Sequence, residues 1–258
     1  MGDELTLQQA AHIALRCLDL TSLNDGDDAA AIMRLCARAQ GSVGPVAAVC
    51  VWPRFAALAR RQLPPSIRVA AVANFPAGGS EVDAALRDVR QVVEAGAQEV
   101  DLVLPWRALR DGDAATAARL LQAGRRACDG LTLKIILESG ELRDATLIEQ
   151  ASRLALDAGA DFLKTSTGKT PTGATPAAAE AMLRAIAAHP AACDRVGLKF
   201  SGGIRRVVDA LPYIALCRSR LGDAALQPRR LRIGASGLLD DIEAVLGGHA
   251  AEPAGTGY

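Results

Sequence analysis

Eight short runs of β-branched and other apolar residues alternate with longer segments whose apolar residues repeat at helical spacing. The runs are Cys17–Leu20, Val46–Trp52, Ile67–Phe75, Glu99–Leu104, Leu131–Glu138, Asp161–Ser166, Val196–Ser201 and Leu231–Ala235. Strands that alternate with helices build a parallel sheet, because each helix carries the chain back to the start of the next strand. Eight such units predict a closed α/β fold, the (β/α)8 TIM barrel. An open doubly wound sheet is the alternative, but the first run is short for it and its phosphate fingerprint is missing.

The segments between the runs are predicted to be helices that end at defined positions. Examples are 81–95, 114–128, 144–158 and 176–188, and Gly96, Gly130 and Gly159 stand where three of them can end. A further amphipathic helix at about 5–16 precedes the first run. Barrels of about 250 residues fold as one unit, so we expect a single domain over 1–248. Residues 249–258 have the composition of a flexible C-terminal tail.

The charge balance limits the kinds of partner that we expect. Lys and Arg together number 29, and Asp and Glu together also number 29. A chain without net charge has no general attraction for nucleic acid or for an anionic membrane surface, so we expect neither partner. The apolar runs are also far shorter than the roughly 20 residues needed to cross a bilayer. An anionic ligand must therefore be bound by local groups.

The cysteines and histidines follow no disulfide or metal-binding pattern. Six cysteines are scattered through apolar segments, and the first ten residues lack the basic and apolar parts of a signal peptide. We therefore expect a cytoplasmic protein with reduced thiols. The three histidines, His12, His189 and His249, are isolated from one another and from acidic residues, so no metal site is expected.

Lysine is rare and confined to one part of the chain. Of the 29 basic residues 25 are arginines, and the four lysines are Lys134, Lys164, Lys169 and Lys199. An arginine stays protonated, whereas a desolvated lysine can lose its proton and attack a carbonyl group. In a chain that otherwise uses arginine, lysines inside apolar strands indicate a need for an amine.

Four charged residues fall on consecutive predicted strands. Asp101, Lys134, Lys164 and Lys199 lie on the fourth, fifth, sixth and seventh strands. Neighbouring strands are about 5 Å apart, so inward side chains at similar depth should converge on one cavity. The surplus positive charge would lower the pKa of the least solvated amine. By residue type alone Lys164 and Lys199 are equal candidates for a nucleophile, and each could instead be a salt-bridge partner.

Glycine-rich segments follow the last three predicted strands. They are TSTGKT at Thr165–Thr170, SGG at Ser201–Gly203 and GASG at Gly234–Gly237, the last leading into a predicted helix. Glycine lets backbone N–H groups approach an anion, and barrels often bind phosphate at these loops and a helix N-terminus. We therefore expect a phosphate site here. The GKT sequence is not a nucleotide-binding P-loop, because Leu163 stands where that motif requires Gly.

With these segments the chain resembles the deoxyribose-phosphate aldolase family of class I aldolases. The matching segments are LDLTSLN at 18–24, AAVCVWPRF at 47–55, NFPAG at 74–78, EVDLVLP at 99–105, LKIILESGEL at 133–142, DFLKTSTGK at 161–169, VGLKFSGGIR at 196–205 and RIGAS at 232–236. They cover all eight predicted strands in order. The resemblance implies a cofactor-free lyase that reversibly cleaves 2-deoxy-D-ribose 5-phosphate to acetaldehyde and D-glyceraldehyde 3-phosphate in deoxyribonucleotide catabolism. It also implies a homodimer.

The resemblance assigns roles to the lysine cluster. It places the imine on Lys164, the lysine of DFLKTSTGK, and makes Lys199 the neighbouring cation. Asp101 would transfer protons through a water molecule, and Lys134 would orient and partly neutralise Asp101. Lys199 and the apolar interior would then lower the pKa of Lys164.

The same resemblance implies a set of substrate-binding residues and one residue of the tail. The substrate-binding residues are Thr21, Thr167, Gly168, Lys169, Gly202, Gly203, Arg205, Gly234, Ser236 and Gly237. The family commonly has a hydroxyl residue where this chain has Gly237, which would lose one hydrogen bond to phosphate. It also commonly has Pro-Ala where this chain has Phe200 and Ser201, beside Lys199. Tyr258 could fold over the active site to assist proton transfer.

Three other functions fit part of this pattern. Another Schiff-base barrel enzyme could act on a different phosphorylated aldol. A non-catalytic sugar-phosphate binder would need the phosphate loops but would have no use for inward lysines and Asp101. A metal-dependent class II aldolase would require histidine ligands near the mouth of the barrel, and the histidines here are isolated.

Overall fold

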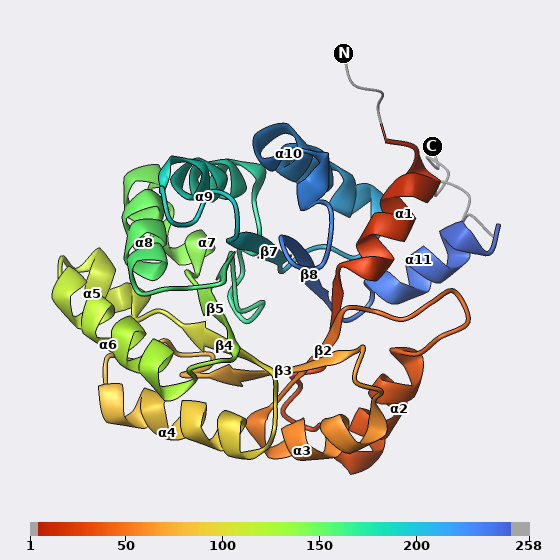
Figure 1. Cartoon of the computed structure of the whole chain (residues 1–258), viewed down its shortest axis with the longest axis horizontal. Helices are drawn as coiled ribbons and strands as arrows, with labels where there is room; N and C mark the ends of the chain where they lie inside the picture. The colour runs from red at the N-terminus through yellow and green to blue at the C-terminus, as the bar shows by residue number, and fades with distance from the viewer. Residues whose placement is uncertain (1–4, 249–258) are drawn as a thin grey trace, which may run out of the picture.

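A computed structural model describes residues 5–248, which form a closed barrel of eight parallel strands (Figure 1). The strands are β1 (Leu18–Thr21), β2 (Ala48–Val51), β3 (Arg68–Ala73), β4 (Glu99–Val103), β5 (Thr132–Ile136), β6 (Phe162–Lys164), β7 (Gly197–Ser201) and β8 (Leu231–Ala235). They pair in chain order, and β8 pairs with β1 to close the sheet. The predicted barrel is therefore confirmed, and the open-sheet alternative is wrong.

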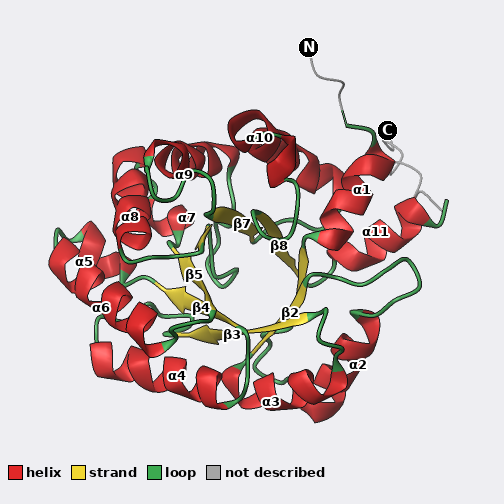
Figure 2. Cartoon of the chain, in the orientation of Figure 1, coloured by secondary structure: helices red, strands yellow, loops and turns green. Residues whose placement is uncertain are grey.

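Helices surround the strands on all sides (Figure 2). They are α1 (Leu7–Arg16), α2 (Ala29–Arg38), α3 (Pro53–Gln62), α4 (Val82–Glu94), α5 (Trp106–Arg110), α6 (Ala114–Ala127), α7 (Ser139–Leu142), α8 (Ala145–Asp157), α9 (Pro176–Ala188), α10 (Val207–Leu221), the 3-10 helix η1 (Asp223–Ala225) and α11 (Leu238–Leu246). The extra N-terminal helix, α1, packs against α10 and α11. None of the helices between residues 5 and 248 is both long and apolar enough to span a bilayer.

Local signals in the sequence fix where the helices begin and end. Asp28, Asp113, Asp144 and Thr175 each accept a backbone N–H in the first turn of the helix that follows. Gly96, Gly130 and Gly159 have φ angles of +74°, +80° and +85°, a backbone conformation that glycine adopts without strain. The predicted helix ends are therefore confirmed at these glycines.

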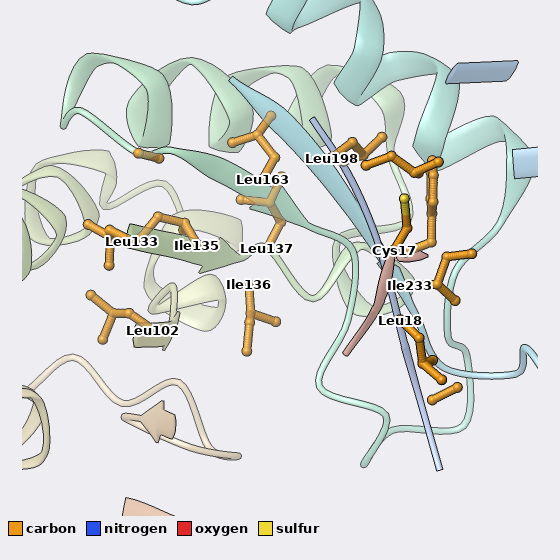
Figure 3. Packing of buried hydrophobic residues seen from close by; sticks show 14 of the residues in the cluster. Cys17, Leu18, Leu102, Leu133, Ile135, Ile136, Leu137, Leu163, Leu198 and Ile233 are labelled. Atoms are coloured by element: carbon orange, nitrogen blue, oxygen red, sulfur yellow. The ribbon is translucent and has the colours of Figure 1, made fainter. Parts of the chain in front are cut away.

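The strands alternate between two environments. Leu102, Leu133, Leu163 and Leu198 are fully buried and pack in the hydrophobic cluster outside the strands (Figure 3). Their neighbours in sequence, among them Asp101, Lys134, Lys164 and Lys199, point to the opposite face of the sheet because side chains alternate along a strand. The barrel thus has an apolar layer beneath the helices and a charged interior.

Candidate active site

The charged residues of β4 to β7 meet inside the barrel, as their positions in the sequence predict. Asp101 pairs in register with Lys134, and Lys164 pairs with Lys199. The side chains of Asp101, Lys134 and Lys199 are fully buried, and that of Lys164 is 3% exposed. All four therefore lie in the interior of the barrel, where charges are weakly screened.

Asp101 contacts all three lysine amines. Its Oδ1 lies 2.8 Å from Lys134 Nζ, and its Oδ2 lies 2.7 Å from Lys164 Nζ and 2.8 Å from Lys199 Nζ. The attraction of Lys134, Lys164 and Lys199 outweighs the opposing effect of burial and holds the pKa of Asp101 well below its usual range. Asp101 is therefore an anion that three amines share.

Three further buried charges extend this cluster, and the sequence pattern did not reveal them. Lys199 Nζ lies 2.5 Å from Asp19, and Lys134 Nζ lies 2.5 Å from Glu99. Arg232 joins the two carboxylates, with contacts of 2.6 Å to Asp19 and 2.8 Å to Glu99. Glu99 precedes Asp101 by two residues and so lies on the same face of β4, which is the sequence signal that could have identified it.

The seven buried groups, here called the charged core, carry unequal numbers of positive and negative charges. They comprise Asp19, Glu99, Asp101, Lys134, Lys164, Lys199 and Arg232. With every group ionised, four cations face three carboxylates. A buried unpaired charge is costly, so the charged core is balanced when one amine is neutral.

The contacts of each lysine indicate which amine is neutral. Burial lowers the pKa of Lys164, Asp101 raises it, and the charge of Lys199 lowers it, so the pKa lies below its ordinary value. Burial also acts to lower the pKa of Lys199, but Asp101 and Asp19 outweigh it and raise that pKa. The pKa of Lys134 is raised in the same way, by Asp101 and Glu99. Lys164 is therefore the amine that loses its proton most readily.

Cys50 of β2 also borders the charged core. Its Sγ lies 3.8 Å from Asp101 Oδ2, and burial raises the pKa of the thiol. The thiol therefore stays protonated and adds no charge to the cluster.

A pocket of about 260 Å³ opens above the lysines at the carboxyl ends of the strands. It is lined by Thr21, Leu23, Asn24, Lys164, Thr167, Gly168, Lys169, Ser201, Gly202, Gly203, Ile204, Arg205, Gly234, Ala235, Ser236 and Gly237. All ten residues that the resemblance implied for substrate binding are in this set. Of the charged core, Lys164 alone lines this pocket.

The rim of the pocket has the features of an anion site. The side chains of Lys169 and Arg205 are exposed and form no ion pair with any residue in 5–248. Gly168, Gly202 and Gly203 have φ angles of +76°, +87° and +87°, which expose their backbone to the pocket. The rim therefore offers two cations and accessible backbone N–H groups to a phosphate.

The first turn of α11 adds a third element to this rim. Gly237 is the N-cap of α11, and among the described residues no side chain caps the first N–H groups of the helix. Free N–H groups at a helix N-terminus favour an anion. The three predicted loops are thus brought together around one pocket.

Phe200 and Ser201, the two departures from the family pattern beside Lys199, are both buried. The buried Phe200 packs on Tyr213 of α10, with ring centroids 4.8 Å apart, while Lys199 points inward. Ser201 donates through Oγ to the backbone oxygen of Ser166 at 2.8 Å. Ser201 therefore ties the loop after β7 to the loop after β6.

A sequence model of the DeoC/LacD family aldolases matches residues 13–236 of the chain. This match covers every strand of the barrel and the whole pocket rim except Gly237. The chain belongs to the DeoC/LacD family of aldolases. The protein is therefore an aldolase, a carbon–carbon lyase.

Solved structures similar to this aldolase have the same fold. A candidate deoxyribose-phosphate aldolase from Coccidioides immitis is 25% identical with a TM-score of 0.81, over 94% of this chain and 88% of that chain. The apo form of a candidate deoxyribose-phosphate aldolase from Toxoplasma gondii ME49 is 25% identical with a TM-score of 0.85, over 94% and 97%. The tetrameric deoxyribose phosphate aldolase from Aeropyrum pernix is 23% identical with a TM-score of 0.70, over 92% of each chain, and shows the fold alone.

The remaining expectations concern the C-terminal tail and a metal site. Tyr258 and the tail at 249–258 lie outside the described residues. Within 5–248, no group of three or more His, Cys, Asp or Glu side chains is arranged to hold a metal ion.

Proposed function

We propose that this aldolase reversibly cleaves 2-deoxy-D-ribose 5-phosphate through a Schiff base on Lys164. One observation carries the proposal: Lys164 is the amine with the lowered pKa, and it alone of the charged core lines the pocket with the anion-binding rim. A sugar phosphate held by the rim would present its aldehyde carbon to an amine that is neutral and nucleophilic.

The first half of the reaction forms the imine. The neutral amine of Lys164 attacks the aldehyde carbon of the open-chain sugar to give a carbinolamine, which loses water to give the protonated imine. Asp101 lies 2.7 Å from Lys164 Nζ and is held as an anion by its other contacts. It would exchange protons with the intermediate through a water molecule, while Lys134 fixes its orientation.

The second half breaks the carbon–carbon bond. The hydroxyl on C3 would lose its proton to the water molecule held by Asp101, the C2–C3 bond breaks, and its electron pair passes to the protonated imine to form an enamine. D-Glyceraldehyde 3-phosphate leaves, and the same water would return the proton to the enamine carbon. A second water then hydrolyses the resulting imine to release acetaldehyde and the free amine of Lys164. Lys199 stays protonated and stabilises the negative charge of Asp101 throughout.

The phosphate would be bound by the rim of the pocket. Lys169 and Arg205 would supply positive charge, and the residues named for substrate binding would supply N–H and hydroxyl donors from the three loops. Thr21 donates through Oγ1 to the backbone oxygen of Asp19 at 2.8 Å and faces the same pocket. It is therefore placed to contact the sugar near Lys164.

Trapping the imine tests this proposal. Acetaldehyde and borohydride are added to the purified protein in the presence of a chelator, and the modified peptide is located by mass spectrometry. We expect a stable adduct on Lys164, and none on that peptide in the Lys164→Arg variant. An adduct on Lys199 would overturn the assignment of the nucleophile.

A product assay separates the proposed substrate from other phosphorylated aldols. We expect release of acetaldehyde and D-glyceraldehyde 3-phosphate from 2-deoxy-D-ribose 5-phosphate. A different aldehyde released from another sugar phosphate at higher kcat/KM would move the proposal to that substrate. Binding of the sugar phosphate without any turnover would support the non-catalytic binder instead.

We further propose a cytoplasmic homodimer that acts in deoxyribonucleotide catabolism. All six cysteines are free and five are buried, which suits a reducing compartment. Light scattering of the purified protein would give the mass of the assembly, and the mass of a single chain or of a tetramer would contradict a dimer.

A further inference from the structure

We propose that Glu138 is a positioning residue that holds the loop Thr167–Thr170 in its phosphate-binding conformation. It would thereby give the enzyme its preference for phosphorylated over unphosphorylated sugars. The inference rests on the proposed function, since it concerns how the same pocket recognises the phosphate. Glu138 itself does not line the pocket.

Within residues 5–248, the hydrogen bonds of the Glu138 carboxylate all go to this one loop. Oε1 accepts the backbone N–H of Thr167 at 3.1 Å, and Oε2 accepts the Thr167 hydroxyl at 2.6 Å. Oε1 also accepts the Thr170 hydroxyl at 3.3 Å. The carboxylate therefore binds the loop on both sides of Gly168 and Lys169, which face the phosphate pocket.

A further hydrogen bond within the loop links Glu138 to Lys169 through Thr167. The Thr167 Oγ1 that donates to Glu138 also accepts the backbone N–H of Lys169 at 3.1 Å. The orientation of the Thr167 hydroxyl is therefore fixed by Glu138, and the backbone of Lys169 is fixed by that hydroxyl. Loss of the carboxylate would release two donors of Thr167 and loosen the segment that carries Lys169.

The backbone of Glu138 has an unfavourable conformation, which suggests that its side chain has a role. Its φ and ψ angles are +55° and +53°, in the left-handed region that favours glycine. A non-glycine residue costs on the order of 1 kcal/mol there. Glycine would avoid this cost, so the side chain of Glu138 must contribute something that glycine cannot.

The turn that contains Glu138 also packs closely on the far end of the loop. A Cβ atom on Gly140 would lie 2.2 Å from the backbone oxygen of Thr172. Beyond it, Gly173 and Gly202 pack backbone to backbone, and Ala174 donates its N–H to the oxygens of Ser201 and Gly202. The loop after β6 is thus held by the turn at Glu138 on one side and by the loop after β7 on the other.

The protein keeps this carboxylate buried despite the cost of burial. Glu138 is fully buried, and burial raises its pKa, while the hydrogen bonds from Thr167 and Thr170 and the charge of Lys164 oppose that rise. A carboxylate in the protein interior persists only with donors around it. The donors that the structure describes around Glu138 all belong to the loop Thr167–Thr170.

The experiment compares Glu138→Gln with the matched control Glu141→Gln, which lies three residues away and has no hydrogen bond from its side chain to any described residue. Steady-state kinetics are measured with 2-deoxy-D-ribose 5-phosphate and with 2-deoxy-D-ribose. We expect the Glu138→Gln variant to raise KM for the phosphorylated sugar by about tenfold or more, with kcat/KM for the unphosphorylated sugar changed less than about twofold. The control should leave both values unchanged.

A binding measurement makes the test independent of catalysis. Calorimetric titration with inorganic phosphate should show an affinity about tenfold lower for Glu138→Gln than for the wild type and the control. The variant Glu138→Gly removes all three hydrogen bonds, whereas glutamine keeps one acceptor oxygen, and glycine also relieves the backbone strain. It should therefore fold and show a loss of phosphate affinity at least as large.

The outcomes separate this inference from the proposed function. Equal loss of kcat/KM for both sugars, or unchanged phosphate affinity in both Glu138 variants, would overturn the positioning role. Failure of the wild type to form the Lys164 adduct would overturn the proposed function, while the phosphate titration would still decide the role of Glu138.

Discussion

The two ends of the charged core differ in how completely their cations are paired. At the end away from the pocket, Lys134 contacts Glu99 and Asp101, and Arg232 contacts Asp19 and Glu99. At the pocket end, the one ion pair that Lys164 forms with a residue in 5–248 is to Oδ2 of Asp101, and Lys199 contacts the same oxygen. Complete pairing stabilises a charge, and incomplete pairing favours its loss. In this barrel the most reactive cation is therefore the one with the fewest carboxylate partners.

The comparison of Lys164 with Lys199 is the sharpest form of this difference. The two lysines are in register on adjacent strands and are both buried. Lys199 has the additional partner Asp19 at 2.5 Å, and this contact keeps it charged. Residue type and depth do not distinguish the two amines, but the second carboxylate does.

The largest effect is expected from the substitution Lys164→Arg. Arginine keeps the positive charge but cannot lose its proton, so no imine can form. We expect kcat/KM for cleavage of 2-deoxy-D-ribose 5-phosphate to fall by roughly 10⁴-fold or more, as for other lost nucleophiles. Turnover near that of the wild type would show that Lys164 is not the nucleophile.

The fully paired end can be tested by Arg232→Met. The change leaves Asp19 and Glu99 buried without their shared cation, which should lower the free energy of unfolding by about 3–5 kcal/mol. Urea denaturation measures this value. The control Arg38→Met breaks exposed ion pairs with Asp240 and Glu243 and should cost less than about 1 kcal/mol. A similar small cost for both variants would mean that the charged core does not depend on Arg232.

The substitution Lys199→Met changes how completely Lys164 is paired with Asp101. Without Lys199, Asp101 pairs more strongly with Lys164, and a repelling charge is lost, so both changes raise the pKa of Lys164. The enzyme needs the neutral amine, so kcat/KM rises with pH through this pKa. We expect the rising limb to move up by about one pH unit or more. In the control Lys169→Met, which changes a rim lysine outside the charged core, the limb should stay in place while KM rises. If the rising limb of Lys199→Met stays where it is in the wild type, Lys199 does not control the pKa of Lys164.

The smallest effect is expected at the rim, from Gly237→Ser. Gly237 has a φ angle of −105°, and an added Cβ would meet no atom within 4 Å, so serine fits without strain. Its hydroxyl can add one hydrogen bond to phosphate, worth about 1 kcal/mol. We expect KM for the phosphorylated sugar to fall about fivefold and KM for 2-deoxy-D-ribose to stay the same. A fall in both values would place the serine near the sugar instead.

The sequence predicts most of the fold because its periodicity is clear. Seven of the eight predicted runs contain the observed strand, although some are longer, as with Val46–Trp52 against Ala48–Val51. The first run, Cys17–Leu20, overlaps β1 but ends one residue before it. The predicted and observed strand ends differ because apolar residues continue along the chain beyond the last hydrogen bond between neighbouring strands. The short helices α5 and α7 depend on how the loops pack, which periodicity does not reveal.

The sequence predicts the lysine cluster but not its charge balance. Asp101 and the three lysines stand out because each interrupts an apolar run. Glu99 and Arg232 lie near the beginnings of their strands, where a charged residue is commonly solvent-exposed, and Asp19 is the one charged residue of the short strand β1. Their burial follows from closure of the barrel, which the pattern of one strand cannot show. The hydrogen bonds of Glu138 likewise could not be predicted, because Glu138 and Thr167 are 29 residues apart in sequence.

The scarcity of lysine allows the central claim to be measured directly. The chain has only four lysines, so ¹³C labelling of lysine Cε gives four NMR signals, which single Lys→Arg variants assign. Titration of the folded, substrate-free protein then gives a pKa for each amine. We expect one signal, absent in Lys164→Arg, to titrate well below the ordinary lysine value of about 10.4, with Lys134 and Lys199 above it. A Lys164 signal that titrates at or above that value would show that Lys164 is not the neutral amine of the charged core.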